Sequence, residues 1–122
     1  MTWEHSAISA LSQGLEDHSV DNRGDVGSWV RKHSLHSLAG VFAADDQVLQ
    51  RLSAGDDGLA IRLLGQILRG ITEKIDRLRA AAGRMLEIML YEQRVEGAAN
   101  SGMSECLEQL RGLVPALPAN SR

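Results

Sequence analysis

Apolar residues recur at spacings of three and four along most of the chain, which is the period of an amphipathic α-helix. No alternating run of β-branched residues indicates a strand. Both prolines, Pro115 and Pro118, stand near the end, so no proline interrupts a helix before them. The pattern therefore predicts an all-α fold.

The predicted helices are separated by polar or glycine-rich stretches. We expect helices over residues 2–16, 25–44 and 72–93, another with its apolar stripe from Ala60 to Ile71, a short piece within 43–58 and a last short helix from Leu107 to Val114. The clearest stripe lies within 72–93 and consists of Ile75, Leu78, Ala82, Met85, Leu86 and Met89. The residues after the last helix, PALPANSR, are expected to form an extended tail.

Two of these helices resemble copies of one unit. VRKHSLHSL begins at Val30 and LRAAAGRML begins at Leu78, and each has an aliphatic residue, an arginine, a small residue and a leucine at matching places. The arginines, Arg31 and Arg79, are 48 positions apart. Helix pairs that repeat at about 40–47 residues are typical of HEAT and armadillo solenoids, although the same spacing also arises by chance in amphipathic helices.

The repeat predicts a HEAT/armadillo-like α-solenoid fragment of about two helical repeats. We place these repeats in residues 1–95, and a linker, a short helix and the tail in residues 96–122. Solenoids usually need about three or more repeats. The chain is therefore expected to be a piece of a longer solenoid or to need a partner that covers its ends.

The stretch RGDVGSWVR, residues 23–31, combines glycine, charge and tryptophan in a few positions. We interpret it as a helix corner, in which Gly24 and Gly27 permit tight turning or close helix approach, Asp25 caps the following helix and Trp29 anchors that helix against a neighbour. A ligand loop and an adhesion tripeptide are the alternatives. An adhesion role needs an exposed extracellular loop, and nothing in the sequence indicates secretion.

The repeated arginines are expected to be structural. Each could pair with an acidic or carbonyl group at an adjacent corner, and Asp25 and Asp76 are the acidic candidates. Loss of either arginine should then weaken the packing of the helices.

Composition narrows the classes of function. A chain of 122 residues with 43% hydrophobic residues fits one globular domain. Its 13 basic and 16 acidic residues give a net charge of −3, which argues against nucleic acid as the main partner. No apolar run is long enough to span a bilayer, so no membrane association is expected.

The sequence lacks the motifs of common catalytic sites. It has no glycine-rich phosphate loop and no paired-cysteine or HExxH zinc motif. His33 and His36 could share a metal but lack further ligands, and Cys106 has no activating base beside it. We therefore expect no cofactor, no metal and no enzymatic activity.

Two segments together resemble the tubulin-folding cofactor D family. EDHSVDNRGDVGSWVRKHSLHSL resembles a segment in the C-terminal half of that family, and ITEKIDRLRAAAGRMLEIML resembles the next signature in the same order. The similarity extends from about Ile8 to Tyr91 and is weaker in LEQLRGLVPAL. The motif positions, expected to serve helix packing or a partner surface, are Arg23, Gly24, Asp25, Gly27, Trp29, Arg31, Lys74, Asp76, Arg77 and Arg79.

The resemblance implies a role in tubulin assembly. Members of the family bind β-tubulin after chaperonin folding, cooperate with other tubulin-folding cofactors, and help to join β-tubulin to α-tubulin. They also associate with an Arf-like small GTPase, and the assembled complex stimulates GTP hydrolysis by tubulin. The resemblance thus implies a cytoplasmic, cytoskeleton-associated protein, and the alternative is a structural solenoid segment or interaction module without tubulin contact of its own.

Overall fold

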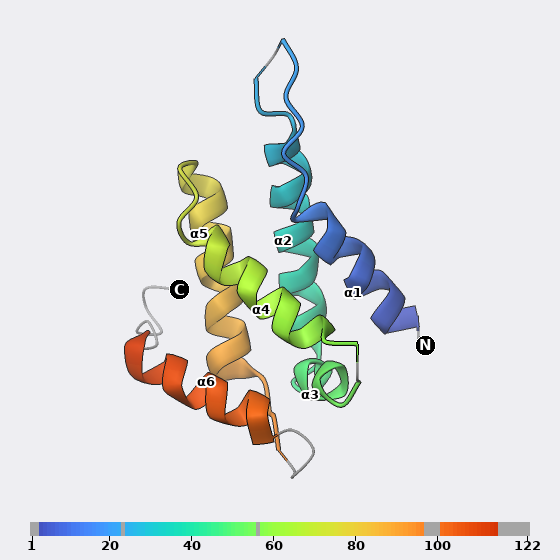
Figure 1. The fold of residues 1–122 in the computed structure, drawn as a ribbon, viewed down its shortest axis with the longest axis vertical. Helices are drawn as coiled ribbons and strands as arrows, with labels where there is room; N and C mark the ends of the chain where they lie inside the picture. The colour runs from blue at the N-terminus through green and yellow to red at the C-terminus, as the bar shows by residue number, and fades with distance from the viewer. Residues whose placement is uncertain (1–2, 23, 56, 97–100, 115–122) are drawn as a thin grey trace.

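The computed structural model describes residues 3–22, 24–55, 57–96 and 101–114 and confirms an all-α fold (Figure 1). No strand forms in these ranges. The elements are α1 (Trp3–Gly14), α2 (Gly27–Ala44), α3 (Val48–Ser53), α4 (Leu59–Gly70), α5 (Asp76–Glu87), the π-helical turn η1 (Ile88–Glu92) and α6 (Ser101–Leu113).

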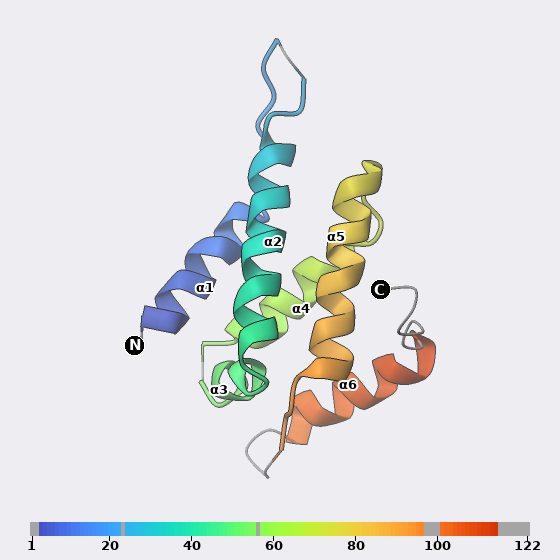
Figure 2. The ribbon, with the colours of Figure 1, turned by 180° about the vertical axis from the view of Figure 1, so that it is seen from behind.

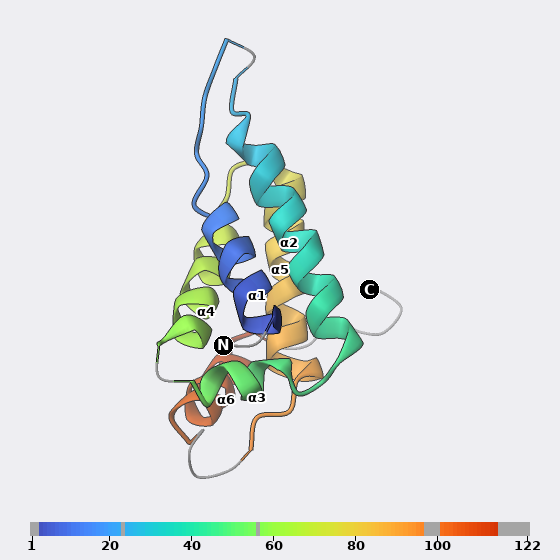
Figure 3. The same cartoon turned by 90° about the vertical axis from the view of Figure 1, so that its right-hand side faces the viewer.

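The four longer helices before η1 form two stacked hairpins. α1 and α4 point in one direction and lie in one layer, and α2 and α5 return in the opposite direction in a second layer (Figures 2 and 3). α2 packs along α5, and α1 packs beside α4. This arrangement of two like hairpins is the solenoid-like stack that the repeat predicted.

The predicted apolar stripes form the core between the layers. In α4, Leu63 and Ile67 are fully buried, because their spacing of four places both on the face toward α5. In α5, Ala82 and Met85 face back in the same way. α4 ends at Gly70, where an added Cβ would lie 2.8 Å from the Cβ of Ala82, so the two helices cross in close contact at this glycine.

The fourth predicted helix begins later than expected, at Asp76 instead of residue 72 or 73. The corner after Gly70 closes on itself, because the amides of Thr72 and Glu73 donate to the carbonyls of Arg69 and Gly70, at 3.1 Å each. Ile75 is extended. A turn therefore occupies the residues that the periodicity assigned to the helix.

The two hairpins do repeat in the structure, but the predicted alignment of α2 with α5 is wrong by one residue. Arg31 is buried in α2, with 5% of its side chain exposed, whereas 47% of the Arg79 side chain is exposed. Four buried positions of each helix correspond at a separation of 47; they are Arg31, Leu35, Leu38 and Phe42 in α2 and Leu78, Ala82, Met85 and Met89 in α5 and η1. The prediction aligned the two arginines because their residue types match. The stripe of buried residues, however, determines which face of each helix points toward the core.

The end of the stack opposite the long loop is closed by α3, η1 and α6. Gln93 is buried there: its amide nitrogen donates to the carbonyl of Phe42 at 2.6 Å, and its amide oxygen accepts from the backbone of Leu49 at 2.9 Å. α6 contributes buried Met103 and Leu107 to the same core as the repeats. The predicted extended tail lies outside the described residues.

None of the helices within the described ranges is both long and apolar enough to cross a membrane.

Candidate functional site

A long loop joins α1 to α2 and projects beyond the end of the stack (Figure 1). Near its tip, Asp21 and Gly24 exchange backbone hydrogen bonds of 3.0 Å in both directions. Gly24 has φ 108°, a left-handed conformation that suits glycine, as predicted for a tight turn. Arg23, also predicted as a motif position, lies outside the described residues.

Gly27 lets the returning chain pass directly over the outgoing one. Its amide donates to the carbonyl of Ser19 at 2.9 Å. A Cβ at this position would lie 2.5 Å from the carbonyl oxygen of Asp17, which is closer than real Cβ atoms approach backbone. The predicted need for close approach at Gly27 is confirmed.

The N-cap position of α2 is Val26, one residue after the predicted Asp25, but the side chain of Asp25 still caps the first turn. One carboxylate oxygen accepts a hydrogen bond of 3.0 Å from the amide of Ser28, which lies in the first turn and has no partner within the helix. The Ser28 hydroxyl in return donates to the carbonyl of Asp25 at 2.7 Å.

Arg31 connects this loop to the second hairpin. Its guanidinium donates to the carbonyl of Asp17 at 2.7 Å and to the Asp25 carboxylate at 2.9 Å. It also donates to the Glu73 carboxylate at 3.2 Å, in the corner between α4 and α5. The predicted corner role of Arg31 is thus confirmed, and Asp25 is one of its acidic partners.

The pairing moves the pKa of both members. The hydrogen bonds from Arg31 lower the pKa of Asp25, and the bonds to Asp25 raise the pKa of Arg31 despite the opposing effect of burial. Asp17 also has a lowered pKa, chiefly because the Ser19 hydroxyl donates to its carboxylate. Each of these groups therefore stays charged at neutral pH.

Arg79 meets the same corner from outside. It donates to the backbone carbonyl of Glu73 at 3.0 Å and pairs with the carboxylate of Asp76, its predicted partner. Glu73 therefore receives Arg31 on its side chain and Arg79 on its main chain. Because Arg79 and Asp76 are exposed, this second pair lies in solvent.

The predicted burial of Trp29 is wrong. Its side chain is 57% exposed. Successive helical residues turn by about 100°, so a residue two positions before buried Arg31 points away from the core. The motif positions Lys74 and Arg77 are exposed as well, on the surface near Trp29 and the corner.

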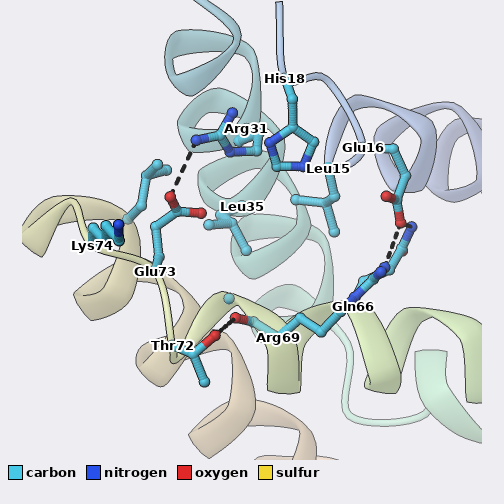
Figure 4. Close-up of a pocket in the computed structure, with 12 residues that line it drawn as sticks. Leu15, Glu16, His18, Arg31, Leu35, Gln66, Arg69, Thr72, Glu73 and Lys74 are labelled. Atoms are coloured by element: carbon cyan, nitrogen blue, oxygen red, sulfur yellow. Dashed lines mark hydrogen bonds and ion pairs between the residues drawn. The ribbon is translucent and has the colours of Figure 1, made fainter. Parts of the chain in front are cut away.

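An open pocket of about 350 Å³ lies between the end of α1, α2 and the α4–α5 corner (Figure 4). Its apolar floor includes Leu35 and Leu78. The charged and polar lining consists of Glu16, His18, Arg31, Gln66, Arg69, Thr72, Glu73 and Lys74. Charges of both signs therefore line the pocket.

Glu16 and Gln66 hold the far side of this pocket. The Gln66 amide nitrogen donates to the Glu16 carboxylate at 2.7 Å and to the carbonyl of Ser12 at 3.1 Å, and its oxygen accepts from the Ser12 hydroxyl at 2.6 Å. The bond from Gln66 is the main reason that the pKa of Glu16 is lowered. This network fixes α1 against α4.

The described residues contain no group of three or more His, Cys, Asp or Glu side chains that could hold a metal. His33 and His36, the predicted metal candidates, are both exposed on α2. The site therefore consists of ion pairs around an open pocket.

Sequence reasoning missed Glu73, Gln66 and Gln93 as members of these networks. The periodicity places Glu73 in the first turn of a helix, whereas it lies in a corner and reaches Arg31 across the hairpins. The two glutamines carry a visible signal, since each interrupts or ends an apolar stripe. A buried amide at such a position needs partners from another element.

Comparisons with known sequences give matches to tubulin-folding cofactor D. Residues 61–120 match the family model described as the C terminal of tubulin folding cofactor D. A protein of Schizosaccharomyces pombe named tubulin-folding cofactor D is 31% identical over 80 residues. Over these residues the chain is similar to tubulin-folding cofactor D.

The alignment with the yeast cofactor D covers 66% of this chain and 7% of the yeast protein. The chain therefore corresponds to a small part of that relative. The family-model match begins inside α4 and includes α5, with its EKIDRLR motif, and α6. It lies after the RGDVGSWVR motif and extends through LEQLRGLVPAL, the segment where the resemblance was expected to weaken. No solved structure gives a significant match.

Proposed function

We propose that this chain is a cofactor D-like module that binds β-tubulin and assists its folding after the chaperonin and its assembly with α-tubulin. The observation that carries the proposal is the match of residues 61–120 to the C-terminal region of the tubulin-folding cofactor. The stacked hairpins support it, because solenoid repeats offer extended surfaces to other proteins.

The proposed mechanism is surface contact without catalysis by this chain. The ion-paired corner around Arg31 would hold the two hairpins at a fixed angle and so fix the relative positions of their exposed faces. Cooperation with other tubulin-folding cofactors and an Arf-like small GTPase, and stimulation of GTP hydrolysis by tubulin, form part of the same proposal. So does a cytoplasmic, cytoskeleton-associated location.

The test is direct binding of the purified chain to purified tubulin, supplied both as heterodimer and as newly released β-subunit. We expect saturable binding that is stronger for the β-subunit. A variant with Arg31→Ala should bind less well if the angle between hairpins matters, and Arg79→Ala, which alters an exposed pair, should bind nearly as wild type.

A second candidate is a structural segment whose partners are neighbouring solenoid repeats. The exposed Trp3 and Leu113, at opposite sides of the stack, favour it, because both are large apolar side chains left in water. A folded chain that binds neither form of tubulin would contradict the first proposal and support this one.

A further inference from the structure

The helices α2 and α5 together are cationic in an otherwise acidic chain. Together these two helices carry five lysine or arginine side chains and two carboxylates, whereas the whole chain has a net charge of −3. α2 itself contains no acidic residue. Both helices begin at the same end of the molecule (Figure 2), and helix N-termini carry partial positive charge.

The carboxylates at this end are already engaged. Asp25 and Glu73 pair with Arg31, and Asp76 pairs with Arg79. Lys32 and Arg77 have no carboxylate partner within the part of the chain that the structure describes. Two cations are therefore available to an anionic partner.

These two cations flank a hollow of about 130 Å³, here called the Trp29 hollow. It is lined by Ser28, Trp29, Lys32, Ile75, Arg77 and Leu78. An apolar cavity of roughly 150 Å³ accepts a ring the size of benzene, so this hollow has room for one aliphatic side chain. Trp29, at the edge of the hollow, is 57% exposed.

We propose that the Trp29 hollow docks an acidic polypeptide segment of a partner protein. An aliphatic side chain of the segment enters between Trp29 and Ile75, and flanking aspartate or glutamate carboxylates pair with Lys32 and Arg77. The proposal goes beyond the proposed function, because it names the chemistry of the recognised segment and holds whichever protein supplies it.

A polypeptide fits better than a nucleic acid. Asp25 and Asp76 stand beside the hollow with 40% and 86% of their side chains exposed, so Lys32 and Arg77 form two separate cationic points and not a continuous basic track for a phosphate backbone. A peptide can place its few carboxylates at the two cations and its apolar residue in the hollow. Such rim charges chiefly steer and orient a partner.

The test uses fluorescein-labelled peptides with one central leucine, flanked by glutamates in one peptide and by glutamines in its matched control. We expect the full chain to raise the anisotropy of the glutamate peptide and to leave the glutamine peptide unbound at the same concentration. In a Trp3→Phe background Trp29 is the remaining tryptophan, and its emission should shift to shorter wavelength on binding.

Charge-reversal variants locate the site. Lys32→Glu combined with Arg77→Glu should weaken binding by roughly tenfold, since each change replaces an attractive surface pair with a repulsive one. Arg62→Glu changes an exposed cation on α4, in the other layer, and should leave binding within about twofold. Circular dichroism and melting curves should show that all variants are folded.

Three results would overturn the proposal. Equal binding of the glutamate and glutamine peptides would remove the charge requirement. Equal weakening by Arg62→Glu would show that only overall charge matters. Stronger competition by a single-stranded oligonucleotide than by unlabelled glutamate peptide would assign the surface to nucleic acid. The tubulin measurement is independent, because it can succeed through another face when this one fails.

Discussion

Two arginines at matching places in one motif have different surroundings. Arg31 is buried and has three partners from different segments, whereas Arg79 is exposed and closes a local turn. Removing a buried charge leaves its partners without hydrogen bonds, and removing an exposed one leaves water to replace it.

Arg31→Ala is therefore expected to destabilise the chain by about 2–4 kcal/mol, because Asp25 and Glu73 lose a cation that is itself buried. Arg79→Ala should cost at most about 1 kcal/mol, as for other exposed ion pairs. Urea unfolding followed by circular dichroism compares the two. Similar losses from both variants would show that the two arginines are equivalent after all.

Stability should also depend on pH through Asp25. Its pKa lies below its ordinary value of 3.8 because Arg31 donates to the carboxylate. A lowered folded-state pKa stabilises the fold above the ordinary value, and that stability is lost as pH falls toward the lowered pKa. The pKa values of Asp17 and Glu16 are lowered too and act in the same direction.

We expect Asp25→Asn to melt below wild type at neutral pH, and the difference to shrink as the pH falls below 3.8, where wild type begins to lose the same interaction. Thermal melting followed at several pH values measures this. Ser37→Ala, at an exposed position on the same helix, should run parallel to wild type at every pH. A difference for Asp25→Asn that stays constant with pH would exclude the ion pair as its cause.

At the scale of elements, the crossing of α4 and α5 depends on a missing side chain. A methyl group on Gly70 would lie 2.8 Å from the Cβ of Ala82, a rigid atom that cannot turn aside. Gly65, in the middle of the same helix, has no such neighbour within 4 Å. The two glycines therefore respond to the same change in opposite directions.

Gly70→Ala is expected to cost about 1–3 kcal/mol, since α4 and α5 must move apart to admit the methyl group. Gly65→Ala should stabilise by about 0.5–1 kcal/mol, because alanine favours an open helical position over glycine. Chemical denaturation of both variants against wild type measures the signs. An increase in the free energy of unfolding on Gly70→Ala would show that α4 and α5 leave room for a methyl group where they cross.

At the scale of the whole molecule, α6 is part of the core even though the sequence suggested a separate segment after residue 95. Leu107 is fully buried against the repeats, whereas 79% of the Leu113 side chain is exposed. The same substitution at these two leucines therefore tests whether the last helix folds with the rest.

Leu107→Ala should destabilise the chain by about 2–5 kcal/mol and keep a single unfolding transition. Leu113→Ala should stay within about 0.5 kcal/mol of wild type, as for surface changes. Differential scanning calorimetry reports both quantities. A second transition, or a negligible effect of Leu107→Ala, would make α6 an independent appendage.

Local patterns predicted the helices and most of the core, because burial of residues such as Leu63, Ile67 and Met85 follows from spacing along one helix. They also placed the cap at Asp25 and the close approach at Gly27. Local patterns did not predict features that depend on tertiary structure. The ion pair of Arg31 and Glu73 joins residues far apart in the sequence. The exposure of Trp29 depends on which face of α2 packs against α5.

The position of Arg31 also determines how the stack can bend. Its guanidinium donates hydrogen bonds to Asp17 and Asp25 in the projecting loop of the first hairpin. It also donates to Glu73 in the corner of the second hairpin. Tilting one hairpin away from the other lengthens the bond to Glu73, so the loop and the corner can only move together. A protein that binds both the loop and the corner would therefore select one angle between the hairpins. In a longer stack, the curvature would be the sum of such angles, each set by the contacts of a single side chain.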